Sequence, residues 1–437
     1  MSEPLLVGVL AIGAMLFVGA IGVPVAFSMI VVGIGGLWYF GGLAFVASTL
    51  KTMPYQILSE YAFAVIPMFI LMGALASVAG LTTELYAVTH RLFGRIRGGL
   101  LMATTMASAI FGAISGSTIV NATVFTRIAL PEMLKYGYER GISAGCIAAS
   151  GTFAALIPPS ISLVIVAILT EGSIGAMLIA GILPGILTAV IYLFGIAVMV
   201  RIRPDWAPRR GPSYTLREQL RGLGDIAPAV VLILIVLGGI YSGLMFPSSA
   251  GAVGAAGALL IGLMRRRFDW KNLWSALQGT ATATAALFFV IIGGLIFSRL
   301  LTYGGFITDL SAMVAGWKMT PLELIIAICV LYLILGMFID TLSVMLITIP
   351  FLWPVANHIG VDVIWFAIIV VKMVEIATIT PPVGMNLFAV MSASDGTVKS
   401  GELIRGVMPF IVIELFVLAL LVAFPGISTW LPSQMGN

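Results

Sequence analysis

The sequence is a succession of apolar runs of about 20 residues, each bounded by charged or turn-forming residues. A helix of that length crosses the hydrocarbon core of a bilayer. Hydrophobic residues make up 60% of the chain and charged residues 9%, so a soluble fold could not bury this much apolar surface. The sequence therefore predicts an all-α polytopic membrane protein embedded in the lipid bilayer.

The runs divide into two halves that present the same order of segments. Each half holds three spans, an amphipathic surface arm, two short apolar legs, a broken span and a last span. In the first half these are predicted at 5–23, 25–47, 61–79, 82–98, 99–114 with 118–134, 141–170 and 174–200. In the second half they are predicted at 225–244, 248–264, 280–298, 302–318, 321–338 with 341–356, 361–392 and 401–425. The resulting units cover residues 1–200 and 225–437, with a Pro-, Gly- and Arg-rich cytoplasmic linker at 201–224.

Short motifs recur between the two halves at an offset of about 224 residues, which indicates an internal repeat. The matching pairs include GLTTEL with GFITDL, IPPS with TPPV, TEGS with SDGT, and IAGILP with IRGVMP. Each pair of short legs is predicted to form a re-entrant helical hairpin, at 99–134 and at 321–356. Five crossings then remain in each half, about ten in all. Because five is odd, the second repeat must be inverted relative to the first.

The distribution of basic residues tests this topology independently. Seventeen of the 22 Lys and Arg residues fall on one side of the membrane and three on the other. The basic side is expected to be cytoplasmic, which places both termini outside. Ordinary transmembrane hairpins would leave the parity unchanged, so the charge pattern supports inversion without deciding whether the hairpins are re-entrant.

A Pro-Pro pair interrupts the broken span of each half, in IPPS at 157–160 and TPPV at 380–383. Proline removes a backbone donor and blocks the hydrogen bond to the residue four positions earlier, so each pair should unwind its helix. Freed carbonyls suit a cation, and the N-termini of half-helices suit a carboxylate. A simple proline kink is the alternative, but the symmetric recurrence beside two polar hairpin tips favours unwound binding sites. Inverted repeats with interrupted helices are typical of secondary transporters.

Other side chains give no sign of enzymatic chemistry. The sequence has no P-loop, dinucleotide or metal-ligand motif, and Cys146 and Cys329 are predicted to be buried packing residues. His90 and His358 are isolated in sequence and are predicted to lie on surface segments. The chain is therefore expected not to be an enzyme, to carry no cofactor, to bind no nucleic acid and to draw its energy from an ion gradient. An intramembrane enzyme and a channel remain remote alternatives.

Four stretches give the sequence a family resemblance. They are the SGST tip with the following Asn121, the PEM that ends the first hairpin, SGTFAALIPPSI and TPPVGMN. Together they resemble, over essentially the full chain, the large membrane subunit of tripartite ATP-independent periplasmic (TRAP) transporters. The resemblance implies an elevator mechanism, in which the hairpins and broken helices move past a fixed scaffold.

The resemblance also implies ligands and partners. Sodium would be the coupling ion and a small organic acid the substrate. A small four-helix membrane subunit and a periplasmic substrate-binding protein would be the partners, in a bacterial inner membrane with both termini periplasmic. A stand-alone sodium-coupled carboxylate symporter with the same architecture is the alternative.

Site residues follow from the resemblance by position. The first sodium site would use the hairpin tip and main-chain oxygens near the first break: Ser115, Ser117, Asn121, Ala154, Ile157 and Pro159. The second sodium site would use the equivalent positions of the second half: Gly336, Ala377, Thr380 and Val383. The substrate would lie between the two tips, near Ser117, Asn121, Asp340, Thr341 and Asn386, and Arg127 is a further candidate because of its charge, although the family usually has a small residue there.

Charged residues inside predicted membrane segments are costly and need an explanation. Arg127 either attracts an anionic substrate or extends to the interface and pairs with Glu132. Lys372 and Glu375 are three residues apart and are predicted to form a structural ion pair on one helix face. Glu414 is predicted to face another helix or subunit and not the substrate.

Overall fold

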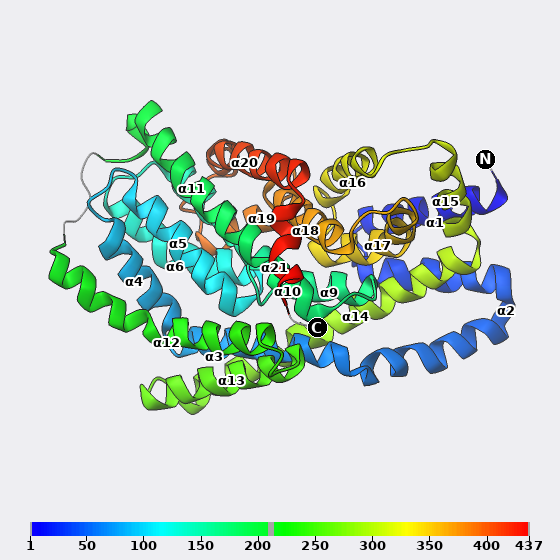
Figure 1. The fold of residues 1–437 in the computed structure, drawn as a ribbon, viewed down its shortest axis with the longest axis horizontal. Helices are drawn as coiled ribbons and strands as arrows, with labels where there is room; N and C mark the ends of the chain where they lie inside the picture. The colour runs from blue at the N-terminus through cyan, green and yellow to red at the C-terminus, as the bar shows by residue number, and fades with distance from the viewer. Residues whose placement is uncertain (1, 209–213, 436–437) are drawn as a thin grey trace.

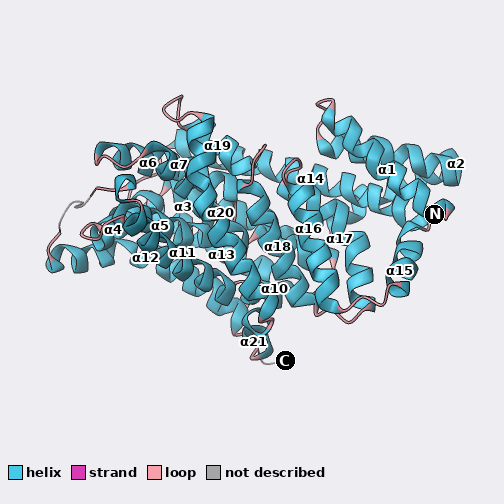
Figure 2. Ribbon diagram, turned by 90° about the horizontal axis from the view of Figure 1, so that it is seen from above, coloured by secondary structure: helices cyan, strands magenta, loops and turns pink. Residues whose placement is uncertain are grey.

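The computed structural model describes residues 2–208 and 214–435, and every regular element in these ranges is a helix (Figures 1 and 2). Nine of the described helices are long and apolar enough to cross a bilayer. The count is ten if the bent pair Arg140–Leu156 and Ile161–Leu169 is one span. The prediction of an all-α polytopic membrane protein is therefore confirmed.

The helices follow the predicted order of segments. The first half contains α1 (Glu3–Ala20), α2 (Val25–Ser59), α3 (Val65–Val78), α4 (Leu81–Phe93), α5 (Gly99–Ser115), α6 (Thr118–Lys135), α7 (Arg140–Gly151), α8 (Phe153–Leu156), α9 (Ile161–Leu169), α10 (Ile174–Ala180) and α11 (Ile182–Ile202). The second half contains α12 (Leu216–Tyr241), α13 (Pro247–Met264), α14 (Trp270–Tyr303), α15 (Phe306–Gly316), α16 (Pro321–Gly336), α17 (Thr341–His358), α18 (Val363–Ile379), α19 (Met385–Ala393), α20 (Ser400–Ala423) and α21 (Gly426–Ser433). Short 3₁₀ turns lie at Tyr61–Ala64 and Pro204–Trp206. The division into two inverted repeats stays a prediction.

Helix lengths differ from the prediction in two places. α14 has 34 residues, where a span was expected at 280–298, and at 1.5 Å per residue it is about 50 Å long. It must therefore tilt or extend beyond the hydrocarbon core. α2 covers 35 residues, but Gly42 within it has non-helical backbone angles (φ 69°, ψ −179°), so two helices joined at a kink stand where one span was expected at 25–47. α2 and α14 pack extensively against each other (Figure 1).

The linker between the halves is shorter than predicted. α12 begins at Leu216, inside the stretch 201–224, because Thr215 and Glu218 form a capping box at its start. The Thr215 backbone N–H donates to Glu218 at 2.7 Å, and the Glu218 backbone N–H donates to the Thr215 hydroxyl at 3.3 Å. Residues 209–213 of the predicted linker lie outside the described residues. A further helix, α21, follows the last predicted span.

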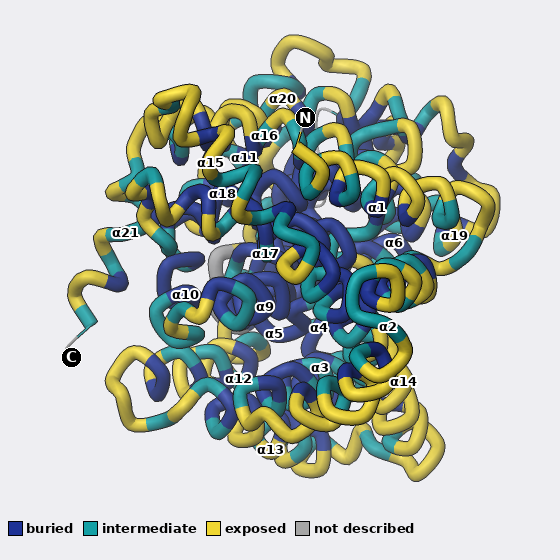
Figure 3. Tube along the Cα trace, turned by 90° about the vertical axis from the view of Figure 1, so that its right-hand side faces the viewer, coloured by how far each residue is buried: buried dark blue, intermediate teal, exposed yellow. Residues whose placement is uncertain are grey.

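The buried residues lie at the centre of the molecule, and the exposed residues lie at its periphery (Figure 3). Fifteen consecutive residues of α18, from Trp365 to Ile379, are buried. The outer helices instead expose large apolar side chains, such as Phe17, Phe194 and Val412. A surface of this kind is stable only when lipid or another membrane subunit covers it.

Glycines allow the helices around α18 to cross at very short range. A Cβ added at Gly406 on α20 would lie 1.8 Å from the Gly141 carbonyl oxygen on α7. A Cβ at Gly145, one turn further along α7, would lie 2.3 Å from the Gly406 carbonyl carbon. The two backbones are therefore in direct contact, as in membrane helix pairs with small residues four positions apart.

Candidate functional site

A cavity of about 620 Å³ lies between the two hairpin tips and two scaffold helices. The tips contribute residues 115–120 and 340–342. The scaffold contributes one face of α3 and one face of α14, including Gly73, Ser77, Ser275, Gly279 and Thr280. The starts of two broken-helix halves complete the lining with Ile161, Ser162 and Met385.

Four helices begin at this cavity. The first residues of α6, α9, α17 and α19 all line it. The backbone N–H groups of a helix's first turn have no partner within the helix, and the macrodipole makes this end electropositive. The four N-termini therefore favour an anion, although in the described part of the chain no Lys or Arg lines the cavity and the Asp340 carboxylate does.

Polar side chains at the tips shape this field. Ser117 is the N-cap of α6, and Asp340 is the N-cap of α17. Both carboxylate oxygens of Asp340 accept from the Ser343 backbone N–H at 3.3 Å. The Ser115 hydroxyl is buried with no hydrogen-bond partner among the described residues. An unpaired buried hydroxyl is unfavourable, so Ser115 has an unused donor and acceptor at the cavity.

The first hairpin tip packs directly onto the first helix break. A Cβ at Gly116, whose φ is +59°, would lie 3.0 Å from the Pro159 carbonyl oxygen. A Cβ at Gly112 would lie 3.0 Å from the Ala154 nitrogen. α5 and α8 therefore meet beside the cavity, and each ends in carbonyl groups that lack a partner within the helix, although the Ala155 carbonyl accepts from the Ser160 hydroxyl. The hairpin tip that carries Ser115 therefore lies against the break that carries Ala154 and Pro159, and the sodium site assigned to them stays a prediction.

The second hairpin meets the second break in the same way. A Cβ at Gly336 would lie 2.4 Å from the Ala377 Cβ, so the ends of α16 and α18 are in contact. Thr380 follows α18 and donates its hydroxyl to the Ile376 carbonyl at 2.6 Å. Val383 is 47% exposed in the turn between α18 and α19.

The donors at both breaks fit a hard monovalent cation. Carbonyl oxygens at helix C-terminal ends, with a hydroxyl nearby, are ligands that sodium accepts. Within residues 2–208 and 214–435, no group of three or more His, Cys, Asp or Glu side chains could hold a metal ion. These sites would therefore rely mainly on backbone oxygens.

Several predicted residues lie away from the cavity. Asn121 is wholly buried and ties three helices together, since it accepts from the Ser108 hydroxyl at 3.0 Å and donates to the Ser108 and Gly151 carbonyls. Asn386 donates to the Ala148 carbonyl at 3.1 Å, and its side-chain oxygen has no partner among the described residues. Both therefore position backbone beside the site, and neither lines the cavity.

Arg127 also lies outside the cavity. Its side chain is exposed on α6, and it makes no ion pair with Glu132, which instead lies 4.0 Å from Lys135. Arg127 lies seven residues beyond Val120, the last cavity-lining residue of α6, and its predicted contact with the substrate stays untested. The Ile157 side chain contacts Gly185 on α11, whereas the sequence analysis assigned a main-chain oxygen of this region to the sodium site.

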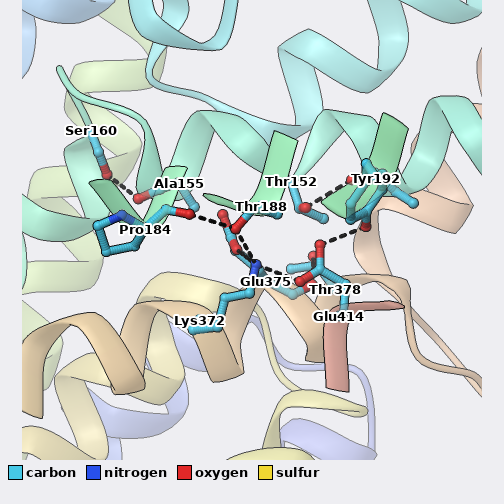
Figure 4. Close-up of polar contacts among 11 residues, drawn as sticks. Thr152, Ala155, Ser160, Pro184, Thr188, Tyr192, Lys372, Glu375, Thr378 and Glu414 are labelled. Carbon is cyan, nitrogen blue, oxygen red and sulfur yellow. Dashed lines mark hydrogen bonds and ion pairs between the residues drawn. The ribbon is translucent and has the colours of Figure 1, made fainter. Parts of the chain in front are cut away.

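A fully buried ionic cluster lies beside the second break (Figure 4). Lys372 donates to Glu375 at 2.8 Å and also pairs with Glu414 on α20. Its third contact is the Thr188 hydroxyl on α11, at 3.3 Å. The predicted ion pair of Lys372 and Glu375 is therefore present, and Glu414 faces these helices as predicted.

The sequence analysis missed the scaffold side of the cavity. Ser77, Ser275 and Thr280 lie in segments that looked like ordinary spans or their flanks. A usable signal was present in GTATATA at 279–285, where small and hydroxyl side chains interrupt an otherwise apolar helix. Small residues there leave room for a ligand that larger ones would fill.

A family model described as the DctM component of the tripartite ATP-independent periplasmic transporter matches residues 12–427. The chain belongs to this TRAP transporter family. It is therefore a subunit of a multi-component membrane transporter and not an enzyme. The sequence resemblance to TRAP large subunits is confirmed.

Similar proteins carry TRAP permease names with different substrates. The C4-dicarboxylate TRAP transporter large permease protein DctM of Pseudomonas aeruginosa is 33% identical over 383 residues, covering 87% of this chain and 88% of the relative. The sialic acid permease SiaM of Vibrio cholerae is 32% identical, covering 94% and 95%. The ectoine/5-hydroxyectoine permease UehC of Ruegeria pomeroyi is 30% identical, covering 91% and 92%.

A solved transporter shares the fold of this TRAP subunit. The YdaH transporter of Alcanivorax borkumensis superposes with a TM-score of 0.64 at 15% sequence identity. The alignment covers 87% of this chain and 89% of that protein. At this identity the likeness concerns the fold alone.

Proposed function

We propose that this TRAP subunit imports a small organic acid, or a related zwitterionic solute, across the bacterial inner membrane in symport with sodium. The observation that carries the proposal is the cavity on which the N-termini of α6, α9, α17 and α19 converge. A carboxylate bound there would accept hydrogen bonds from free backbone N–H groups and from tip hydroxyls. The dicarboxylate, sialic acid and ectoine named for relatives all carry a carboxylate.

Sodium coupling is supported by the opposite ends of the neighbouring helices. α5 and α8 end together at the first break, and α16 and α18 end together at the second. Each pair of C-terminal ends offers carbonyl oxygens to a cation a short distance from the substrate cavity. Cation binding at these ends would fix the tips that enclose the substrate, so ion and solute would move together.

The proposed partners are a small four-helix membrane subunit and a periplasmic binding protein that delivers the substrate. The family description names a tripartite periplasmic system, which supports both. The excess of basic residues on one side supports a cytoplasmic linker and two periplasmic termini. We infer an elevator cycle in which the hairpins and broken helices carry the cavity past α2, α3, α13 and α14.

The test is uptake of candidate organic acids into proteoliposomes that contain this chain and its small partner. An inward sodium gradient is imposed with and without the cognate binding protein, and choline replaces sodium in the control. Uptake that requires both sodium and the binding protein supports the proposal. Sodium-driven uptake without the binding protein would identify a conventional symporter instead. Uptake that does not depend on sodium would refute sodium as the coupling ion.

A further inference from the structure

The cluster around Lys372 is more than a local ion pair, because it connects both helix breaks. Lys372 lies on α18, two helical turns before the second break. All of its ammonium donors have partners on three helices: Glu375 on α18, Glu414 on α20 and Thr188 on α11. Lys372, Glu375 and Glu414 are fully buried. One Glu375 oxygen has no hydrogen-bond partner in the described residues.

One route from Lys372 to the first break runs along α11. The Thr188 hydroxyl accepts from Lys372 and donates to the Pro184 carbonyl at 2.8 Å. Next to Pro184, a Cβ at Gly185 would lie 2.6 Å from the Ile157 side chain. The beginning of α11 is therefore in direct contact with the first break.

A second route runs through Glu414. Tyr192 on α11 donates its hydroxyl to Glu414 at 2.5 Å. The Tyr192 ring meets the Phe153 ring edge-to-face at 4.9 Å, and Phe153 begins the short helix α8 that ends at the first break. Figure 4 shows Lys372, Thr188, Tyr192 and Glu414 converging between the helices that carry the two breaks.

We propose that Lys372 is a positioning residue that couples the two cation sites. The inference rests on the proposed function, in which sodium binds at both breaks. A cation at one break orders the helix end that supplies its carbonyls. Because the buried cluster holds α18 against α11, and α11 against the first break, ordering one end reduces the entropic cost of ordering the other. Sodium binding at the two sites is then cooperative.

The mildest variant that cuts this connection is Thr188→Val, which keeps the shape of the side chain and removes only the hydroxyl. Tyr192→Phe cuts the second route and keeps the ring contact with Phe153. Thr188→Ser retains the hydroxyl and serves as the rescue variant. Thr89→Val is the matched control, since Thr89 is equally buried and donates within its own helix, to the Leu85 carbonyl at 2.9 Å.

The measurement is sodium-dependent thermal stabilisation of the purified complex with its small partner, with choline chloride as the reference, alongside sodium-titrated uptake. Wild type and Thr188→Ser should give a Hill coefficient above one. Thr188→Val and Tyr192→Phe should each raise the half-saturating sodium concentration about threefold to tenfold and bring the Hill coefficient toward one. The substrate KM at saturating sodium should not change in these variants.

The outcomes separate this inference from the proposed function. Sodium binding with an unchanged midpoint and Hill coefficient in both variants would overturn the coupling and leave sodium symport intact. A wild-type Hill coefficient of one would do the same. If sodium changed neither the thermal stability nor the uptake of the wild type, both the proposed sodium symport and the coupling between the two sites would be refuted.

Discussion

The crossing of α7 and α20 makes a sharp prediction for Gly406→Ala. The added Cβ would lie 1.8 Å from the Gly141 carbonyl oxygen, where a normal contact needs about 3.4 Å. The helices must then separate by about 1.5 Å, since the obstacle is backbone and cannot rotate away. Gly145 faces the same point, with its Cβ position 2.3 Å from the Gly406 carbonyl carbon.

The separation should cost at least about 3 kcal/mol of unfolding free energy, the upper end of what overpacking causes. A gap of that size also forfeits a large part of the dispersion energy between the two helices. Glu414 lies two turns further along α20, so the same shift should move it away from Lys372. The assay is thermal unfolding of the purified protein in detergent, where the midpoint should fall by at least a few degrees.

Gly401→Ala provides the matched control on the same helix. Gly401 is exposed near the start of α20, and a Cβ there would meet nothing within 4 Å. Alanine should therefore be neutral or should stabilise the protein by up to about 1 kcal/mol, through helix propensity. If Gly406→Ala unfolded at the wild-type temperature, the direct backbone contact between α7 and α20 would be wrong.

Three further predictions concern charged and titratable side chains. Asp340→Asn should retain the N-cap, because Asn caps as well as Asp, and should weaken uptake of a zwitterionic solute about tenfold while sparing a purely anionic one. Equal effects on both would mean that the carboxylate does not face the substrate. Arg127→Ala should leave the substrate KM within about twofold, because Arg127 is exposed and does not line the cavity. A tenfold rise in the substrate KM would instead show that Arg127 acts at the substrate site. His90 on α4 lies outside the candidate spans, and burial lowers its pKa. As the pH drops below about 6.5, His90 is protonated more readily in the unfolded state than in the folded state. The free energy of unfolding should therefore fall. In thermal melts at several pH values, the unfolding midpoint of His90→Gln should fall less on acidification than that of the wild type. His358→Gln should behave like the wild type.

The candidate site was predictable where it depends on local chemistry. The Pro-Pro pairs and the serines of the SGS tip mark places where a helix cannot continue, and the structure ends α8 and α18 there. Gly336 and Ala377, which the resemblance assigned to one site, are also in contact. Asn121 was assigned to the substrate through the family resemblance, and Arg127 through its positive charge. Which way each faces depends on the rotation of α6 against its neighbours, and no sequence pattern fixed that rotation.

The sequence alone determined that this chain is helical and lies in a membrane, because each apolar run is long enough to span a bilayer. It also determined where the Pro-Pro pairs break two helices, because proline disrupts the hydrogen bonds of its own helical turn. The length of α14 was not determined in this way, since a helix continues into polar residues until something stops it, and neither was the kink of α2 at Gly42. Only the tertiary structure brought Ser77 and Thr280 to the cavity, and Glu414 to Lys372 across 42 residues of chain. Such pairings depend on which helix faces pack together, which is a property of the whole fold.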